Sequence, residues 1–189
     1  MDVRFTSPTP NVLTLRDGTT LTVRPLAGSD AAALSAFMAA LPAADRYFMK
    51  DDVTDTTTIA SWVKNAGRGS SLALLALDGD RVVADAALIR HRGEFRAHHA
   101  EVRVSIVPEY RGKGLGTALV RKLAEVAWEA DMQFLDFELV AGPQDTAIEA
   151  MRSIGAYPVG TLQGFVQDQS GEARDMVFLR LPLGQWFTY

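Results

Sequence analysis

A glycine-rich loop between a strand pattern and a helix pattern constrains this chain more than any other feature. Residues 102–107 alternate between apolar and polar types, and Pro108 ends the run because proline has no N–H for a strand ladder. From Leu115 to Ala127, apolar residues recur every three or four positions, which indicates a helix. The loop consists of Arg111, Gly112, Lys113, Gly114, Leu115, Gly116 and Thr117. Its three glycines let backbone N–H groups converge in front of a positive helix end, which predicts a site for a diphosphate or similar anion.

The composition is that of an ordinary globular domain. The 189 residues are 48% hydrophobic and 22% charged, and the formal net charge of −4 argues against a general nucleic-acid partner. The absence of cysteine excludes disulfides, thiol catalysis and cysteine-ligated zinc. Because no apolar run is long enough for a signal peptide or a membrane span, we expect a cytoplasmic protein with no membrane partner.

The order of the expected elements indicates a mixed α/β domain. We expect a loose leader over residues 1–11 and a single domain over residues 12–189. Apolar runs on both sides of an Asp-Gly pair predict two hairpins, at residues 12–23 and 72–89, and two more strands are expected at 159–166 and 176–181. Further elements are helices at 30–41, from 59 to about Gly67, and at 146–154, and a strand at 134–140. This order lacks the regular βα alternation of a doubly wound fold.

Three kinds of phosphate-binding loop are compatible with glycine-rich sequences. The spacing of a P-loop does not occur in this chain. The dinucleotide fingerprint needs a third glycine where this loop has Thr117, although Asp136 and Glu138 on the next strand keep that alternative open. The third pattern, Arg-x-x-Gly-x-Gly, is met by Arg111, Gly114 and Gly116.

Residues 107–119 resemble the acyl-CoA pyrophosphate motif of the GNAT superfamily of N-acetyltransferases at nearly every position. The order of strands and helices supports the resemblance from about residue 21 to 182. Residues 13–26 and 45–48 are also similar to GNAT domains of bacterial protein lysine acetyltransferases. The resemblance implies one domain with a mixed, mostly antiparallel sheet of about seven strands, splayed at a central parallel pair and flanked by about four helices.

The resemblance also implies a co-substrate and residues that hold it. Acetyl-CoA would donate its acetyl group to an amine acceptor, a protein lysine or a small molecule, with no metal and with a monomer or homodimer as the working form. Backbone N–H groups of residues 111–117, with the Thr117 hydroxyl, would hold the pyrophosphate. Ile106 and Val107 would pair with the pantetheine like an added strand. Gln144 stands where many members of the family have an asparagine in the second cofactor segment.

Glu101 is the expected catalytic base. Lysine amines have a pKa near 10.4, so amide formation needs a group that accepts a proton. Glu101 opens the central strand at a position where the family has a catalytic glutamate, and period two places it on one face with Arg103. A solvated ion pair with Arg103 is the structural alternative. His98 and His99 are rival bases, although we expect them to be solvated loop residues, and adjacent side chains diverge too far for a zinc site with Glu101.

The general acid is not evident in the sequence. Many members of the family carry a tyrosine on the helix that follows the second cofactor segment, and that position is Met151 here. Methionine cannot donate a proton, so Met151 is expected in the core, and Tyr157, Ser153 or water would protonate the thiolate, which is itself a fair leaving group. The missing tyrosine leaves a second hypothesis open, a non-catalytic module that binds or senses acyl-CoA.

Residues 43–57 have two interpretations. The polar segment contains Tyr47 and Phe48, which either insert into the core or belong to a lid that faces the acceptor. Long loops often carry binding residues, so both interpretations remain open from the sequence.

Overall fold

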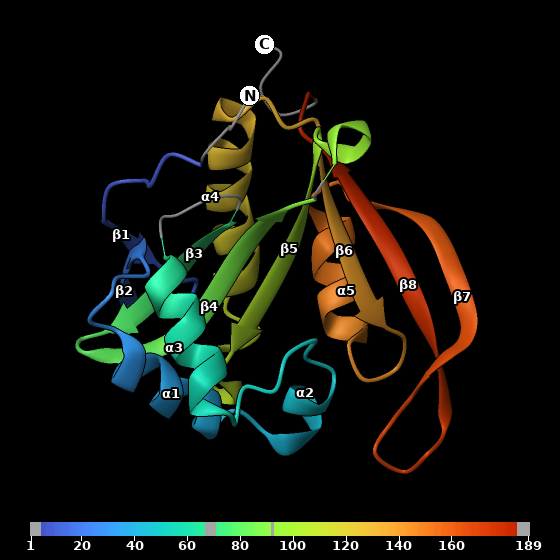
Figure 1. Ribbon diagram of the computed structural model, residues 1–189, viewed down its shortest axis with the longest axis horizontal. Helices are drawn as coiled ribbons and strands as arrows, with labels where there is room; N and C mark the ends of the chain where they lie inside the picture. The colour runs from blue at the N-terminus through green and yellow to red at the C-terminus, as the bar shows by residue number, and fades with distance from the viewer. Residues whose placement is uncertain (1–4, 67–70, 92, 185–189) are drawn as a thin grey trace.

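The protein folds around one eight-stranded sheet (Figure 1). The computed structural model describes residues 5–66, 71–91 and 93–184. The strands are β1 (Asn11–Thr14), β2 (Thr20–Pro25), β3 (Ser71–Asp78), β4 (Arg81–Arg90), β5 (His99–Ile106), β6 (Phe134–Val140), β7 (Tyr157–Gln167) and β8 (Ala173–Pro182). The α-helices are α1 (Ala31–Ala40), α2 (Ala43–Tyr47), α3 (Thr56–Asn65), α4 (Leu115–Glu129) and α5 (Asp145–Ser153), with short 3₁₀ turns at Glu94–Arg96 and Pro108–Tyr110.

The strand order is β1-β2-β3-β4-β5-β6-β8-β7, and all neighbours are antiparallel except β5 and β6. This confirms the mostly antiparallel sheet with a central parallel pair. The described part of the chain has five α-helices where about four were expected. The extra one, α2, has five residues and no buried residue, so it lacks the apolar stripe by which a helix is recognised in a sequence.

The parallel pair stays together for only three residue pairs. His99, Ala100 and Glu101 pair with Phe134, Leu135 and Asp136, and the pairing stops there. β5 continues beside β4 to Ile106, while β6 continues beside β8 to Val140. The sheet is therefore two half-sheets that diverge beyond Glu101, as Figure 1 shows for β5 and β6.

Helices cover both faces of the sheet. On one face, α4 packs on β4 and β5, and α5 packs on β6 and β8. On the other face, which is nearer the viewer in Figure 1, α1 packs on β4 and on α3. The apolar stripe expected on α4 is confirmed, since its buried side chains are at most 3% exposed. They are Leu115, Leu119, Val120, Leu123, Ala124, Val126 and Ala127. Each buried leucine stabilises the fold by about 1.5–3 kcal/mol, which fixes the helix and hence the loop before it.

The ends of the expected segments fall close to those observed. β1 begins at Asn11, and Phe5 is buried in the core, so the division between leader and domain at residue 11 stays a prediction. Gly67, the expected end of a helix, lies outside the described residues, whereas α3 ends at Asn65. Among the helices of the described ranges, none is long and apolar enough to cross a membrane.

Candidate active site

The loop between β5 and α4 presents a row of free backbone donors. Gly112 and Gly114 have φ of +71° and +86°, which only glycine adopts without strain, and Gly114 caps α4 without a side-chain bond. Within the described residues, no hydrogen bond is made by the six backbone N–H groups from Gly112 to Thr117. Six consecutive free N–H groups at a helix N-terminus suit an anion, which is the ligand that the sequence analysis predicts for this loop.

The two cations of the loop bind other parts of the protein. The Arg111 guanidinium lies 2.5 Å from Asp45 at Nη2 and donates from Nε to the Ile106 carbonyl at 2.8 Å. Lys113 Nζ lies 3.0 Å from an Asp17 carboxylate oxygen. The hydrogen bond from Lys113, together with those from Thr19, lowers the pKa of Asp17 to about 2. Arg111 and Lys113 therefore fasten the loop to α2 and to the first hairpin, and the backbone supplies the free donors.

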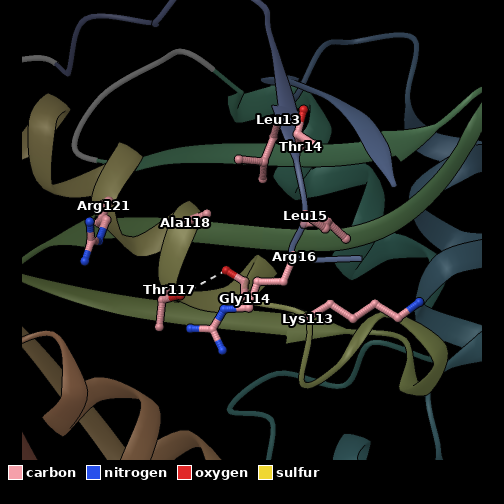
Figure 2. A pocket seen from close by; sticks show the side chains of 9 residues that line it. All are labelled: Leu13, Thr14, Leu15, Arg16, Lys113, Gly114, Thr117, Ala118 and Arg121. Atoms are coloured by element: carbon pink, nitrogen blue, oxygen red, sulfur yellow. Dashed lines mark hydrogen bonds between the residues drawn. The ribbon is translucent and has the colours of Figure 1, made fainter. Parts of the chain in front are cut away.

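A basic pocket of about 280 Å³ lies beside the loop, at the start of α4 (Figure 2). Its lining comes from the end of β1, the loop and the first turns of α4: Leu13, Thr14, Leu15, Arg16, Lys113, Gly114, Thr117, Ala118 and Arg121. The Thr117 hydroxyl donates to the Gly114 carbonyl at 2.9 Å, a bond drawn in Figure 2. To donate to a phosphate, this hydroxyl would have to leave that carbonyl.

Sequence reasoning missed the pocket residues Arg16 and Arg121. Arg121 follows Thr117 by four positions, so helical spacing would have placed both on one face of α4. Arg16 gives no such signal, because it reaches the loop only when the hairpin docks there, with Arg16 N–H donating to the Lys113 carbonyl at 3.3 Å.

At the end of β5, the backbone groups of Ile106 and Val107 differ in whether they are free to bind a ligand. Val107 donates its N–H to the Val83 carbonyl and accepts from the Tyr110 N–H, each at 3.1 Å. Both of its backbone groups are thus used inside the protein. Backbone groups of successive strand residues point to opposite edges, so Ile106 and Val104 face the gap beside β6. This geometry favours Ile106 and Val104 over Val107 as partners of an added strand.

Gln144 lies at the same edge of the sheet as the glycine loop, just after the end of β6. Its Oε1 accepts from the Val140 N–H at 2.7 Å, and its carbonyl accepts from the first turn of α5. The side-chain oxygen therefore closes the turn between β6 and α5, and the amide nitrogen, which has no partner among the described residues, is the group left for a ligand.

Glu101 lies at the point where the half-sheets separate. The residue is 8% exposed, and one carboxylate oxygen lies 2.7 Å from Arg103 Nε and 2.8 Å from Lys50 Nζ. Lys50 Nζ also lies 2.6 Å from Glu138 on β6. Burial raises the pKa of Glu101, but the hydrogen bonds from Arg103 and Lys50 outweigh it and hold that pKa below its usual value. The expected pair with Arg103 exists, but Glu101 is buried.

His99 is a buried strand residue, so the expectation of a solvated loop histidine is wrong for this position. It is the first residue of β5, where its backbone pairs with Phe134 of β6. Its Nδ1 lies 2.7 Å from Asp136 and its ring stacks on Phe134 at a centroid distance of 4.9 Å. Arg180 Nε also donates to Asp136 at 2.7 Å. Asp136 is thus engaged inside a mostly antiparallel sheet, so the dinucleotide alternative is wrong.

Met151, which stands where many family members have a tyrosine, is 7% exposed in the core, as expected. The candidate acids Ser153 and Tyr157 lie elsewhere. The Ser153 hydroxyl donates to the Ala150 carbonyl at 2.7 Å. Tyr157 is in register with Arg180, which pairs with Asp136 and thus with Glu101. Three strand spacings of about 4.8 Å put Tyr157 roughly 14 Å from Glu101. At that distance, Tyr157 is too far away to protonate a thiolate that leaves next to Glu101.

Charged residues of the segment after α1 form ion pairs with residues of the site. Asp45 bonds Arg111, Lys50 bonds Glu101, and Asp51 lies 3.3 Å from Arg103. Tyr47 is 46% exposed and meets Phe48 edge to face at a centroid distance of 5.3 Å. Tyr47 therefore does not insert into the core, and the geometry favours the interpretation of this segment as part of the site.

Comparisons with known proteins agree with this geometry. Residues 36–156 match the model of the acetyltransferase (GNAT) family. A comparison with curated protein sequences finds no match. Among solved structures, ribosomal-protein-alanine N-acetyltransferase from Brucella melitensis is 26% identical with a TM-score of 0.72, over 85% of this chain and 98% of that one.

Two further solved structures share the fold. The GNAT domain of S. lividans PAT is 21% identical with a TM-score of 0.72, over 92% of this chain and 96% of that one. The structure of yncA, described as a putative acetyltransferase from Salmonella typhimurium with its cofactor acetyl-CoA, is 22% identical with a TM-score of 0.72, over 86% of this chain and 94% of that one.

Proposed function

Since the chain belongs to the acetyltransferase (GNAT) family, we propose that it transfers an acetyl group from acetyl-CoA directly to a primary amine. The observation that carries the proposal is the separation of β5 and β6 immediately beyond Glu101. Among the described residues, the separation leaves one edge of β5 without a strand partner, between a set of free N–H donors at one end and a buried carboxylate at the other. Acetyl-CoA bound along that edge would have its pyrophosphate at the free N–H donors and its thioester near Glu101, at the two ends of one strand.

The free N–H groups of residues 112–117 would bind the pyrophosphate, and Arg16 and Arg121 would add positive charge beside it. Acetyl-CoA supplies an activated acyl group whose thiolate leaves readily. The N–H groups of Val104 and Ile106 and the Val104 carbonyl would orient the pantetheine as an added strand orients on a sheet edge, while the Ile106 carbonyl accepts from Arg111.

Glu101 would accept a proton from the acceptor, directly or through a water molecule. Hydrogen bonds from Arg103 and Lys50 hold the pKa of Glu101 below its usual value, so its carboxylate is ionised at neutral pH and attracts cations. We infer that the acceptor enters as an alkylammonium ion, because the ammonium group of Lys50 already lies between Glu101 and Glu138. An external acceptor would displace Lys50.

A protein lysine is the acceptor we favour. The resemblance of residues 13–26 and 45–48 to GNAT domains of bacterial protein lysine acetyltransferases supports that choice over small amines. The exposed rim formed by residues 43–51 and the β7–β8 hairpin, joined by a 3.4 Å bond from Gln169 to the Ala43 carbonyl, would receive the acceptor.

Release of thiol from acetyl-CoA tests the proposal. Purified protein is incubated with acetyl-CoA and with panels of lysine-containing peptides, intact proteins, polyamines and small primary amines. We expect amine-dependent thiol release and a thermal shift with acetyl-CoA alone, because a ligand of the native state raises stability. A thermal shift without thiol release for any acceptor would support a binding or sensing module and contradict the transfer.

A further inference from the structure

Lys50 places an amine of the protein itself in the position we assign to the acceptor. Its Nζ lies 2.8 Å from Glu101 and 2.6 Å from Glu138, and its side chain is 40% exposed. We propose that Lys50 is an internal acceptor, so that the site acetylates the ε-amino group of its own chain. The inference rests on the proposed transferase function, and it adds a modification site to it.

The other lysines of the chain have different surroundings. The sequence contains four lysines. Lys113 is paired with Asp17, Lys122 lies 2.8 Å from Glu125 on α4, and Lys64 is exposed on α3. Lys50 is held against the carboxylates of both half-sheets at the point where they separate. Holding an amine beside its base raises its effective concentration far above that of a lysine that must diffuse in.

The reaction balances without any reactant other than the acyl-CoA thioester. The Lys50 ammonium gives one proton to Glu101 or to water, and the neutral amine attacks the carbonyl carbon. The C–N bond forms, the C–S bond breaks, and the nitrogen loses a second proton. One proton goes to the thiolate and the other to solvent, so an ammonium and a thioester become an amide, a thiol and one proton.

Acetylation would change the charge around Glu101. The groups that face Glu101 are Arg103 and His99 on β5, Asp136 and Glu138 on β6, His91 at the end of β4, and Lys50 with Asp51 after α2. Once acetylated, Lys50 carries no charge, and Glu101 keeps Arg103 as its cation. Burial then raises the carboxyl pKa with one opposing contact fewer, which makes Glu101 a better base near neutral pH. The modified protein should therefore turn over external amines faster.

Labelling with ¹³C-acetyl-CoA followed by tryptic mass spectrometry tests the inference. Acetylation stops trypsin from cutting after Lys50, so the peptide Tyr47–Lys64 replaces Tyr47–Lys50. We expect labelling of Lys50 to approach one acetyl group per chain. We expect a rate independent of protein concentration and at least about tenfold faster than at Lys64, as for a positioned intramolecular reaction.

Three variants separate catalysis at the site from chemical acetylation. Lys50→Arg should lose the label, Lys64→Arg should keep it, and Glu101→Gln should slow labelling of Lys50 while leaving Lys64 unchanged. Labelling of Lys50 at the same rate as Lys64, or at a rate that rises with protein concentration, would overturn the inference.

The pH profile and the thiol assay complete the test. Pre-acetylated protein should show faster turnover of an external amine, with the acidic limb of kcat moved to higher pH. If external amines release thiol while Lys50 stays unlabelled, the internal acceptor is wrong and the transferase function stands. If neither reaction occurs although acetyl-CoA raises the melting temperature, the proposed transferase function is wrong as well.

Discussion

At the scale of single residues, Glu101 combines burial with two cationic partners. We predict that Glu101→Gln lowers kcat by about 10²–10⁴-fold, the usual contribution of a positioned base, because an amide cannot accept the proton. The thermal shift with acetyl-CoA should be unchanged, since the free N–H donors lie at the other end of β5. Steady-state kinetics and thermal melts measure both. The control is Glu149→Gln on the exposed side of α5, whose side chain is 73% exposed. Unchanged turnover in Glu101→Gln would exclude this residue as the base.

Asp85 on β4 is a second acidic residue with an unusual environment. Asp85 is half-buried, and desolvation alone raises the pKa of its carboxyl group from 3.8 to about 7. The unfolded chain therefore loses this proton first, and the folded state becomes less stable as pH rises from about 4 to about 7.

Replacing this carboxyl group should stabilise the protein. We predict that Asp85→Asn raises the free energy of unfolding at pH 8 by up to about 4 kcal/mol, at about 1.4 kcal/mol per pKa unit, and by less than half as much at pH 5. Urea denaturation at the two pH values measures the difference. Asp80→Asn, in the exposed turn of the same hairpin, should change stability little at either pH. An equal gain at both pH values would contradict the raised pKa.

At the scale of elements, the loop between β5 and α4 depends on glycine at Gly114. Gly114 has a φ of +86°, which is strained for any residue with a side chain, and a Cβ at this position would lie 3.3 Å from Arg16 Nε. We predict that Gly114→Ala lowers stability by about 1–2 kcal/mol, the usual cost of left-handed backbone, and also weakens the shift caused by acetyl-CoA. Gly79→Ala is the matched control, because Gly79 has a φ of +57° and open space around it. Melting temperatures with and without acetyl-CoA should separate the two, and equal ligand shifts would contradict a role of the loop in binding.

The elements differ in how well the sequence predicted them. The position of the glycine loop, the place of Glu101 beside Arg103 on β5 and the buried stripe of α4 were predictable because each depends on neighbours within one turn or one strand. Lys50 and Arg16 were not, because they reach the site across the chain, from the segment after α2 and from the first hairpin. His99 was misjudged because its partners, Phe134 and Asp136, lie on a strand distant in sequence.

At the scale of the whole molecule, one edge of the sheet lacks charge. β7 has eleven residues, none of them charged, and Val159, Leu162 and Phe165 are 44–62% exposed. Long uncharged edge strands favour pairing between chains. We predict that Leu162→Lys reduces light scattering of concentrated or heated protein without changing the acetyl-CoA shift. Val12→Lys, on the four-residue edge strand β1, should have a smaller effect. If both lysines act equally, the length of β7 is not the cause.

Only three residue pairs join β5 to β6, so the two half-sheets meet along a short seam. Such a seam should let the half-sheets open against each other at a free energy below that of global unfolding. In hydrogen–deuterium exchange, amides of β6 and β8 should then exchange as one cooperative unit and those of β3 and β4 as another, slower one. A ligand that spans the seam would couple the two units, so acetyl-CoA should bring their protection together. A single protection level without ligand would show that three pairs suffice to make one body.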